Sequence, residues 1–405
     1  MPKESLIYLI WKSIKGLFFL PGWWSQRFIK RDEKIWIFGA WKGILYSDNS
    51  RAFFEFVRNT HSNIQSYWIT KDHELYRQLR EQNIPVVLSE SKDGRNIQKK
   101  ASKAFVSWGV NSDFDGKYLN GCQIVLLWHG MPLKKIGNDE WDFKHHKIGL
   151  WKIIKTKFRK IVLPYEFLIP RSIQNGIFDT ISTSSFFTPF IMSAWHVSED
   201  HVWEVGQPRN DYLFSSKVEE FIAKLDQQFN HPIKVMYMPT FRDSQGEGFN
   251  PFDFAGFNAV SFSRTLQEQN MVFIYKGHFC DQSTLFSDGG RMITVGDKDY
   301  DNLYTFVKDI DILITDYSSI YFDFLLCRKP IILFPFDKDD YLTHSRPFYF
   351  DYELMEGKKV YSWTELETTL KNSDYWTPSE ETILLFNSSI DGSSSERLLN
   401  ILCHE

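Results

Sequence analysis

The alternation of short apolar runs with helical patterns is the feature that most constrains the fold of this chain. Between residues 34 and 128, the strand-like runs are KIWIFGA, SYWIT, IPVVL, KAFVSW and QIVLLW, with helical stretches such as HELYRQLREQN among them. Near residue 230 a second series begins, with the runs IKVMYMP, MVFIYKG, DILITD and PIILFPF. Such alternation is typical of parallel sheets covered by helices. It predicts an α/β fold with two Rossmann-like domains that face a cleft.

Length and composition agree with two folded domains. A chain of 405 residues exceeds what one ordinary hydrophobic core organises. We place an amphipathic segment at residues 1–30, an N-terminal domain at 31–210 and a C-terminal domain at 211–405. With 43% hydrophobic and 24% charged residues, the composition is that of a folded protein. The four cysteines form no C-x-x-C pair and no zinc-type cluster, which indicates a reducing compartment and no metal site.

Two stretches combine basic residues with apolar and aromatic ones. Residues 6–20 place Lys12 and Lys15 on one side of a helical wheel, and the run is too short to span a bilayer. Residues 141–170 form an insert in the N-terminal domain, in which 144–160 carry seven Lys or Arg and no Asp or Glu. Both patterns predict helices that lie on an anionic membrane. The alternatives are a helix docked on the protein's own core for the first and a solvated basic face for the second.

Polar clusters follow four of the predicted strands, and the segment from 311 to 341 carries the strongest one. A buried strand ends at Asp316, and Ser318 and Ser319 then open a helix. A strand end that leads into a helix start is where α/β sheets bind ligands, and its free N–H groups suit a diphosphate. Asp323, further along the helix, would reach a hydroxyl of the donor. The alternative is that Ser318 only caps the helix and Asp316 only makes a turn.

The segment LLWHGMPLKKIGND delivers a histidine to the end of another strand. His129 there would act as a general base near neutral pH. Gly130 would let a substrate approach the backbone, and Lys134 and Lys135 would supply cations for phosphate. The alternative is a histidine held by a carbonyl group at the strand end, beside solvated lysines.

The last two clusters follow strands of the second series. YMPTFRD places Thr240, Arg242 and Asp243 at a strand end, where Arg242 is a fork-shaped donor for phosphate. An Arg–Asp pair on the surface is the alternative. YKGHF places His278 after the next strand. Because His129 and His278 end strands of different domains, a cleft between the domains would bring them together.

These segments together resemble the CDP-glycerol glycerophosphotransferase family, which includes teichoic acid primases, teichoic acid polymerases and related capsule polymerases. WHGMPLKKIGND is similar to the family's WHGTPLKKIG, and YMPTFRD to its APTWRD. DILITDYSSIYFDFLLCRKPIILFPFD follows its donor-site motif almost throughout, and GQPRNDYLF and YSDNSRAFFEF match two further family segments. The resemblance covers roughly residues 34–345. Met131 departs from the usual Thr, and Phe279 stands where the family commonly has Pro.

The resemblance implies a glycosyltransferase-B architecture with an acceptor domain at 31–210 and a CDP-donor domain at 211–405. It implies transfer of glycerol phosphate, or a related polyol phosphate, from CDP-glycerol to a lipid-linked or polymeric acceptor, with release of CMP. His129 and His278 match the two histidines required for activity, and Ser318 and Ser319 match the diphosphate-binding serines. No tightly bound cofactor or metal is implied. The enzyme would serve teichoic acid or capsule synthesis as a peripheral protein on the cytoplasmic face of the plasma membrane.

Three other functions are the alternatives to this transferase. A sugar-nucleotide-dependent glycosyltransferase of the same architecture would release a nucleoside diphosphate instead of CMP. A membrane-docked binding protein with an inactive nucleotide site conflicts with the intact histidine and serine motifs. Nucleic-acid binding through the basic stretch 144–160 lacks any recognisable module, and the net charge of −4 gives no hint of it. The choice between glycerol and ribitol, between priming and polymerisation, and the existence of a homo-oligomer stay open.

Overall fold

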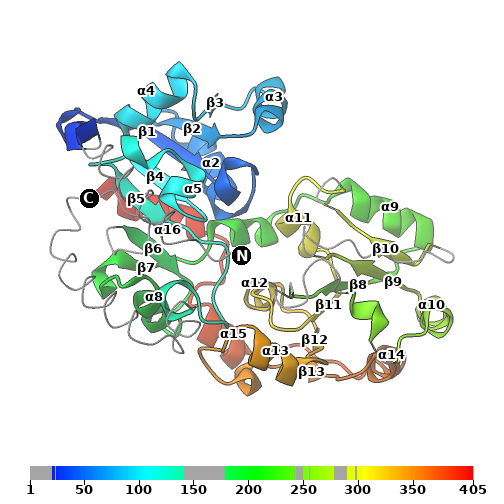
Figure 1. Ribbon diagram of the computed structural model, residues 1–405. Coiled ribbons are helices and arrows are strands. Elements are labelled where there is room, and N and C mark those ends of the chain that lie inside the picture. The colour runs from blue at the N-terminus through cyan, green and yellow to red at the C-terminus, as the bar shows by residue number, and fades with distance from the viewer. Residues whose placement is uncertain are drawn as a thin grey trace, which may run out of the picture.

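A computed structural model describes residues 21–22, 24–140, 178–240, 242, 250–254, 256–277, 290–296 and 299–404. These residues form two parallel sheets with helices packed around them (Figure 1), so the predicted α/β fold with two parallel sheets is confirmed. Residues 6–20 and the insert 141–170 lie outside the described residues, as do Asp243 and His278.

The first sheet has seven parallel strands in the order β3-β2-β1-β4-β5-β6-β7. The register pairs Phe38 with both Trp68 and Phe105, which stacks aromatic rings along the middle of the sheet. Its strands are β1 (Asp32–Gly39), β2 (Gln65–Thr70), β3 (Val86–Leu88), β4 (Ala101–Val106), β5 (Gln123–Leu126), β6 (Asp179–Ser182) and β7 (Val202–Glu204).

The helices of the first half begin where local hydrogen bonds satisfy their free N–H groups. Asp72 accepts from the Leu75 N–H, and Ser91 accepts from the Gly94 N–H, as N-cap residues do. The α-helices are α2 (Asp48–Thr60), α3 (His73–Glu81), α4 (Lys92–Lys100), α5 (Val110–Asp113) and α8 (Thr188–Trp195). The 3₁₀ turns are η1 (Gln26–Phe28), η2 (Trp41–Gly43), η3 (Gly116–Tyr118), η6 (Glu199–His201) and η7 (Pro208–Phe214).

The second sheet has six parallel strands in the order β10-β9-β8-β11-β12-β13. In both sheets the strand order reverses direction next to the first strand, between β1 and β4 and between β8 and β11. Doubly wound sheets bind ligands at this switch point, beyond the carboxyl ends of the strands. The strands are β8 (Ile233–Met238), β9 (Met271–Tyr275), β10 (Met292–Thr294), β11 (Ile312–Thr315), β12 (Ile331–Leu333) and β13 (Lys358–Lys359).

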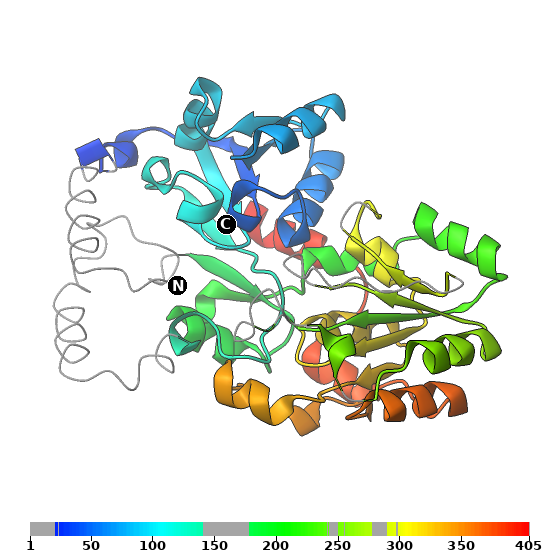
Figure 2. The ribbon, with the colours of Figure 1, turned by 45° about the vertical axis from the view of Figure 1, so that its right-hand side comes forward.

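Helices of the second half cover both faces of this sheet (Figure 2). The α-helices are α9 (Glu220–Phe229), α10 (Ala259–Glu268), α11 (Leu303–Val307), α12 (Ile320–Phe324), α13 (Lys338–His344), α14 (Trp363–Asn372), α15 (Glu380–Phe386) and α16 (Ser394–His404). The 3₁₀ turns are η9 (Pro251–Asp253), η10 (Leu325–Cys327) and η11 (Tyr352–Leu354).

The last helix, α16, returns to the first sheet. Its Leu398, Leu399 and Leu402 are buried in the same cluster as Trp36 and Phe38 of β1. Figure 1 and Figure 2 both show it beside α2, and it contacts α2 and η7. The helix belongs by sequence to the predicted domain 211–405, yet its core contacts are with the other half of the chain.

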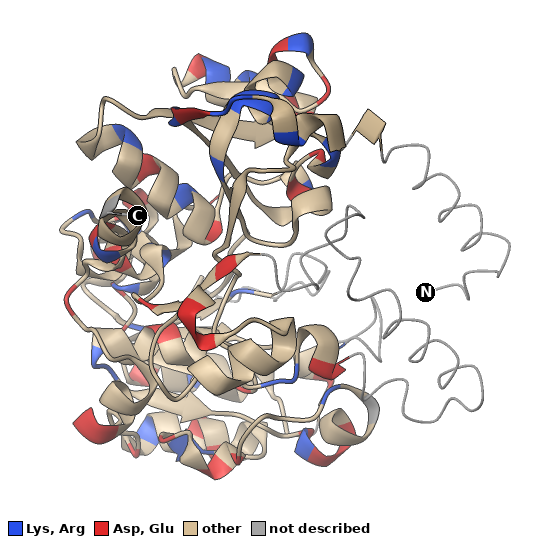
Figure 3. Ribbon diagram, turned by 90° about the vertical axis from the view of Figure 1, so that its left-hand side faces the viewer, with Lys and Arg blue, Asp and Glu red and all other residues tan. Residues whose placement is uncertain are grey.

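The described residues show no concentration of one charge and no membrane-spanning helix. In the view of Figure 3, acidic and basic residues are interspersed over the described ribbon, which agrees with the small net charge of −4. Within the described ranges, no helix combines the length and hydrophobicity that a membrane-spanning segment requires.

Candidate functional site

A cavity of about 400 Å³ lies between the two sheets, at the carboxyl ends of their strands. This volume falls in the range of small-molecule sites. Residues from the first sheet's half and from the second's line it together; they include Trp41, Tyr46, Asp48, Arg51, His129, Arg209, Met238, Lys276, Tyr304, Ser318, Ser319 and Asp323. The structure thus brings His129, Ser318, Ser319 and Asp323, all predicted site residues, around one cavity.

His129 follows β5 and is held by a backbone carbonyl group. Its Nδ1 lies 3.2 Å from the carbonyl oxygen of Ser107. Because a carbonyl oxygen can only accept, Nδ1 carries the proton, and the neutral ring leaves Nε2 as a proton acceptor. Burial lowers the pKa of His129 to about 4, although the nearby Asp48 carboxylate opposes the shift. The ring is therefore uncharged at neutral pH, and the carbonyl contact expected as an alternative coexists with a free basic nitrogen.

Three tryptophan rings surround His129. Their centroids lie 3.8 Å (Trp128), 5.1 Å (Trp41) and 5.2 Å (Trp108) from the imidazole centroid. These apolar rings displace water from the imidazole, which is the physical cause of its low pKa. They were not singled out from the sequence, although Trp108 and Trp128 end predicted strands of the first series and Trp41 directly follows one.

Gly130, in the loop after β5, packs against Ser319 at the start of α12. Its φ is 142°, and a Cβ built on it would lie 2.4 Å from the Ser319 Oγ. Only glycine permits this approach, so the segment of the predicted base touches the predicted diphosphate-binding serine. Ser319 makes no side-chain capping hydrogen bond at the start of α12, and both Ser318 and Ser319 line the cavity.

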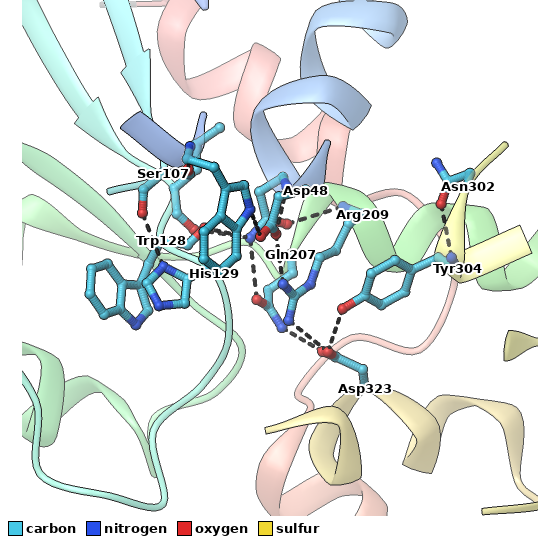
Figure 4. Close-up of polar contacts among 12 residues, drawn as sticks. Asp48, Ser107, Trp128, His129, Gln207, Arg209, Asn302, Tyr304 and Asp323 are labelled. Atoms are coloured by element: carbon cyan, nitrogen blue, oxygen red, sulfur yellow. Dashed lines mark hydrogen bonds and ion pairs between the residues drawn. The ribbon is translucent and has the colours of Figure 1, made fainter. Parts of the chain in front are cut away.

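A buried ionic network links the two halves of the cavity wall (Figure 4). Arg209 of η7 donates to Asp48 of α2 at 2.6 Å and to Asp323 of α12 at 2.7 Å. Asp323 also accepts from Tyr304 at 2.9 Å and from Gln207 at 2.6 Å. Burial alone would lower the pKa of Arg209, but the carboxylates outweigh it and raise that pKa. The guanidinium therefore stays charged and ties elements of both sheets together.

Most of this network was missed at the sequence level. Asp323 was predicted to reach a donor hydroxyl, and that role stays a prediction. Asp48 and Arg209 stand in the segments YSDNSRAFFEF and GQPRNDYLF, which were matched to the family without a role. Two opposite charges in two such matched segments are the signal that would have found them.

Arg242 lies behind the cavity wall in a second buried ionic cluster. Its guanidinium donates to Asp337 at 2.6 Å, to Asp316 at 2.7 Å and to the Thr240 carbonyl group at 2.6 Å. Asp316 in turn accepts from the Thr240 N–H at 2.8 Å. Arg242 is 2% exposed and is not among the residues that line the cavity. The predicted phosphate contact stays a prediction; the observed geometry is that of a residue that fixes the loop after β8 to the end of β11.

Lys134 and Lys135 also lie away from the cavity lining. Lys134 forms a β-bridge with Phe348, and the Lys135 N–H donates to the Pro347 carbonyl group at 2.9 Å. Their segment thereby pairs with a loop of the second half. Their predicted role as phosphate donors stays a prediction, as do the roles of Asp243 and His278. Lys276, two residues before His278, lines the cavity.

In the part of the chain that the structure describes, no three or more His, Cys, Asp or Glu side chains are grouped so as to hold a metal ion.

Comparison with protein families matches residues 24–404 to the family described as CDP-glycerol:poly(glycerophosphate) glycerophosphotransferase. The teichoic acid glycerol-phosphate transferase of Staphylococcus aureus (strain NCTC 8325 / PS 47) is 28% identical, over 91% of this chain and 92% of that protein. The teichoic acid poly(glycerol phosphate) polymerase of Bacillus subtilis (strain 168) is 27% identical, over 97% of this chain but 51% of that protein. The chain thus spans about half the length of that polymerase.

Comparison with solved structures gives the same picture of the fold. The wall teichoic acid polymerase TagF matches with a TM-score of 0.68 at 21% identity, over 98% of this chain and 96% of that chain. At this level of identity, the likeness establishes a shared fold.

Proposed function

The chain belongs to the CDP-glycerol:poly(glycerophosphate) glycerophosphotransferase family, and from that premise we propose that it transfers glycerol phosphate from CDP-glycerol to a lipid-linked or polymeric acceptor. The product would be a teichoic acid or a related capsule polymer, and CMP would be released. The observation that carries the proposal is that His129 lines the cavity while the neighbouring Gly130 lies against Ser319.

The proposed reaction is an in-line displacement at the β-phosphorus of the donor. The acceptor oxygen forms a bond to this phosphorus, and the bond from the phosphorus to the bridging oxygen breaks. CMP leaves with the electron pair, and the acceptor proton moves to the Nε2 of His129. Positioning and electrostatics supply most of the catalysis in phosphoryl transfer. The cavity supports this, because the predicted base and the predicted diphosphate site share it.

Negative charge on the donor needs compensating groups. Ser318 and Ser319 offer hydroxyl donors at the start of α12, and Lys276 offers a cation in the same cavity. We propose the same charge-stabilising role for His278, as its motif predicts. Arg242 would support the site by holding the Thr240 loop, and Asp323 would do so within the Arg209 network.

We further propose a glycosyltransferase-B arrangement, with the acceptor on the first sheet's half and CDP-glycerol on the second's. A cavity lined from both halves supports it.

The enzyme would bind the cytoplasmic face of an anionic membrane peripherally, through residues 6–20 and 141–170. Changing Lys152, Lys155, Lys157 and Lys160 to Gln should reduce co-sedimentation with anionic liposomes at low salt. Equal sedimentation of variant and parent would exclude the insert as the membrane contact.

The function itself is tested with purified protein, CDP-glycerol or CDP-ribitol, and a lipid-linked acceptor. CMP release identifies the donor, and product length separates one added unit from a polymer. His129→Ala should lower CMP release by about 10²–10⁴-fold with the fold intact. Turnover of UDP-sugars with release of UDP, and none of CDP-polyols, would overturn the proposal.

A further inference from the structure

Asp113, at the end of α5, is a fully buried carboxylate that the reaction described above does not use. It accepts four backbone N–H groups: from Lys42 at 2.8 Å, Ser107 at 2.9 Å, Trp108 at 2.8 Å and Gly109 at 3.3 Å. Burial raises the pKa of Asp113, and the four N–H groups counter that effect because they stabilise the charged form. The carboxylate thus fastens two loops, after β1 and after β4, that carry tryptophans of the His129 surround.

One of these N–H groups belongs to the peptide that holds the predicted base. The Trp108 N–H and the Ser107 carbonyl group are two ends of a single peptide unit. The N–H donates to Asp113 Oδ2, and the carbonyl oxygen accepts from the His129 Nδ1 at 3.2 Å. A continuous chain therefore runs from carboxylate to peptide to imidazole.

Hydrogen bonds in such a chain polarise one another. An anion at the N–H end of a peptide increases the negative charge on its carbonyl oxygen, which strengthens the bond to the imidazole N–H. In the Ser–His–Asp arrangement of hydrolases, a carboxylate holds the imidazole directly in the correct tautomer and stabilises the imidazolium that forms. Here one peptide unit stands between the two groups and transmits the same effect.

We propose that Asp113 is a positioning residue for His129, which it keeps in the Nδ1–H tautomer through the Ser107–Trp108 peptide. The Nε2 atom is then always available to accept the proton of the acceptor hydroxyl group. The hydrogen-bond chain on the Nδ1 side also stabilises the imidazolium that forms during transfer. This inference rests on the proposed role of His129 as the base.

The kinetic test is Asp113→Asn, which keeps the size of the side chain and removes its charge. We expect kcat to fall about 10–100-fold with little change in KM, the size of effect seen when a metal-binding histidine loses the group that orients it. In a His129→Gln background, the same change should lower residual turnover by less than twofold. A merely structural residue would cost the same factor in both backgrounds, and that result would overturn the proposal. Asp179→Asn, a buried carboxylate of β6 that pairs with His201, is the matched control and should leave kcat unchanged.

A spectroscopic test separates this proposal from the proposed function. Protein labelled with ¹⁵N-histidine gives a His129 signal, assigned by its loss in His129→Gln. The wild-type spectrum should show a protonated Nδ1 and an unprotonated Nε2, and Asp113→Asn should show a tautomer mixture. A wild-type Nε2–H tautomer, or an unchanged tautomer in the variant, would overturn the link even where the variant folds poorly. Full turnover by His129→Gln would overturn the role of the base instead, whatever the spectra show.

Discussion

His129 combines a basic nitrogen with an environment that resists its protonation. Burial among rings lowers its pKa to about 4, while Asp48 acts in the opposite sense and Arg209 and Arg346 act in the same sense. The active neutral form therefore persists as the pH falls to about 5. An ordinary imidazole with a pKa of about 6.5 would be only about 3% neutral at that pH. We expect kcat/KM for CDP-glycerol to stay level between pH 8 and pH 5, and an acid limb centred between pH 6 and 7 would contradict this.

Gly130 is the residue whose backbone brings the base segment to the donor serines. Gly130→Ala would place a Cβ 2.4 Å from the Ser319 Oγ at a φ of 142°. We expect CMP release to fall at least tenfold, because a displacement of about 1 Å at a reacting group costs that much or more. Gly121→Ala is the matched control, since its φ is also positive and its nearest contact is 3.6 Å away. Both variants should lose about 1–2 kcal/mol of stability because of the positive φ. Equal rates of CMP release by the two variants would argue against a role for the contact between Gly130 and Ser319.

Whether a site residue could be predicted depends on how far its interaction partner lies from it in the sequence. The location of His129, Ser318 and Ser319 at one cavity was predictable, because each follows an apolar run and the strand ends of a parallel sheet face the ligand. The partner of His129 is the carbonyl group of Ser107, which depends on the register of β4 with β5. No periodicity encodes such a register, so the link to Asp113 became visible only in three dimensions.

At the scale of elements, the buried Arg209 network joins α2, η7 and α12. Arg209→Gln would leave Asp48 and Asp323 buried without their cation, which costs about 3–5 kcal/mol. Urea unfolding of the variant and the parent measures this loss. Arg328→Gln breaks the half-exposed pair with Glu380 and should change stability by no more than about 1 kcal/mol.

The elements themselves were largely predictable, and the exceptions have a physical reason. Strands such as β8, β9 and β11 are buried on both faces and appear as continuous apolar runs. β13, at the sheet edge, has only two residues, both Lys and half-buried, so no apolar run marks it. The insert 141–170 lies outside the described residues, and its membrane contact stays a prediction.

At the scale of the whole molecule, the two halves of the chain contact each other in more than one place. The Arg209 network bridges them at the cavity, and the 131–139 segment pairs with the loop at 347–349. The helix α16 then passes back to cover the first sheet. A boundary drawn once, at residue 210, follows the order of the sheets along the sequence but cannot express this return.

Because α16 packs on the first sheet, a substitution in this helix should destabilise the first half of the chain. Leu398 is fully buried against the β1 cluster, so Leu398→Ala should cost about 2–5 kcal/mol. Leu384→Ala on α15 removes the same atoms from a side chain that is 47% exposed, and should cost less than about 1 kcal/mol. Limited proteolysis with mass spectrometry locates the effect. In Leu398→Ala, new cleavage should arise between residues 32 and 126, far before the change in the sequence, because α16 covers the sheet formed there. Cleavage confined to residues 233–333, or equal losses of stability in the two variants, would show that α16 contributes little to the first sheet.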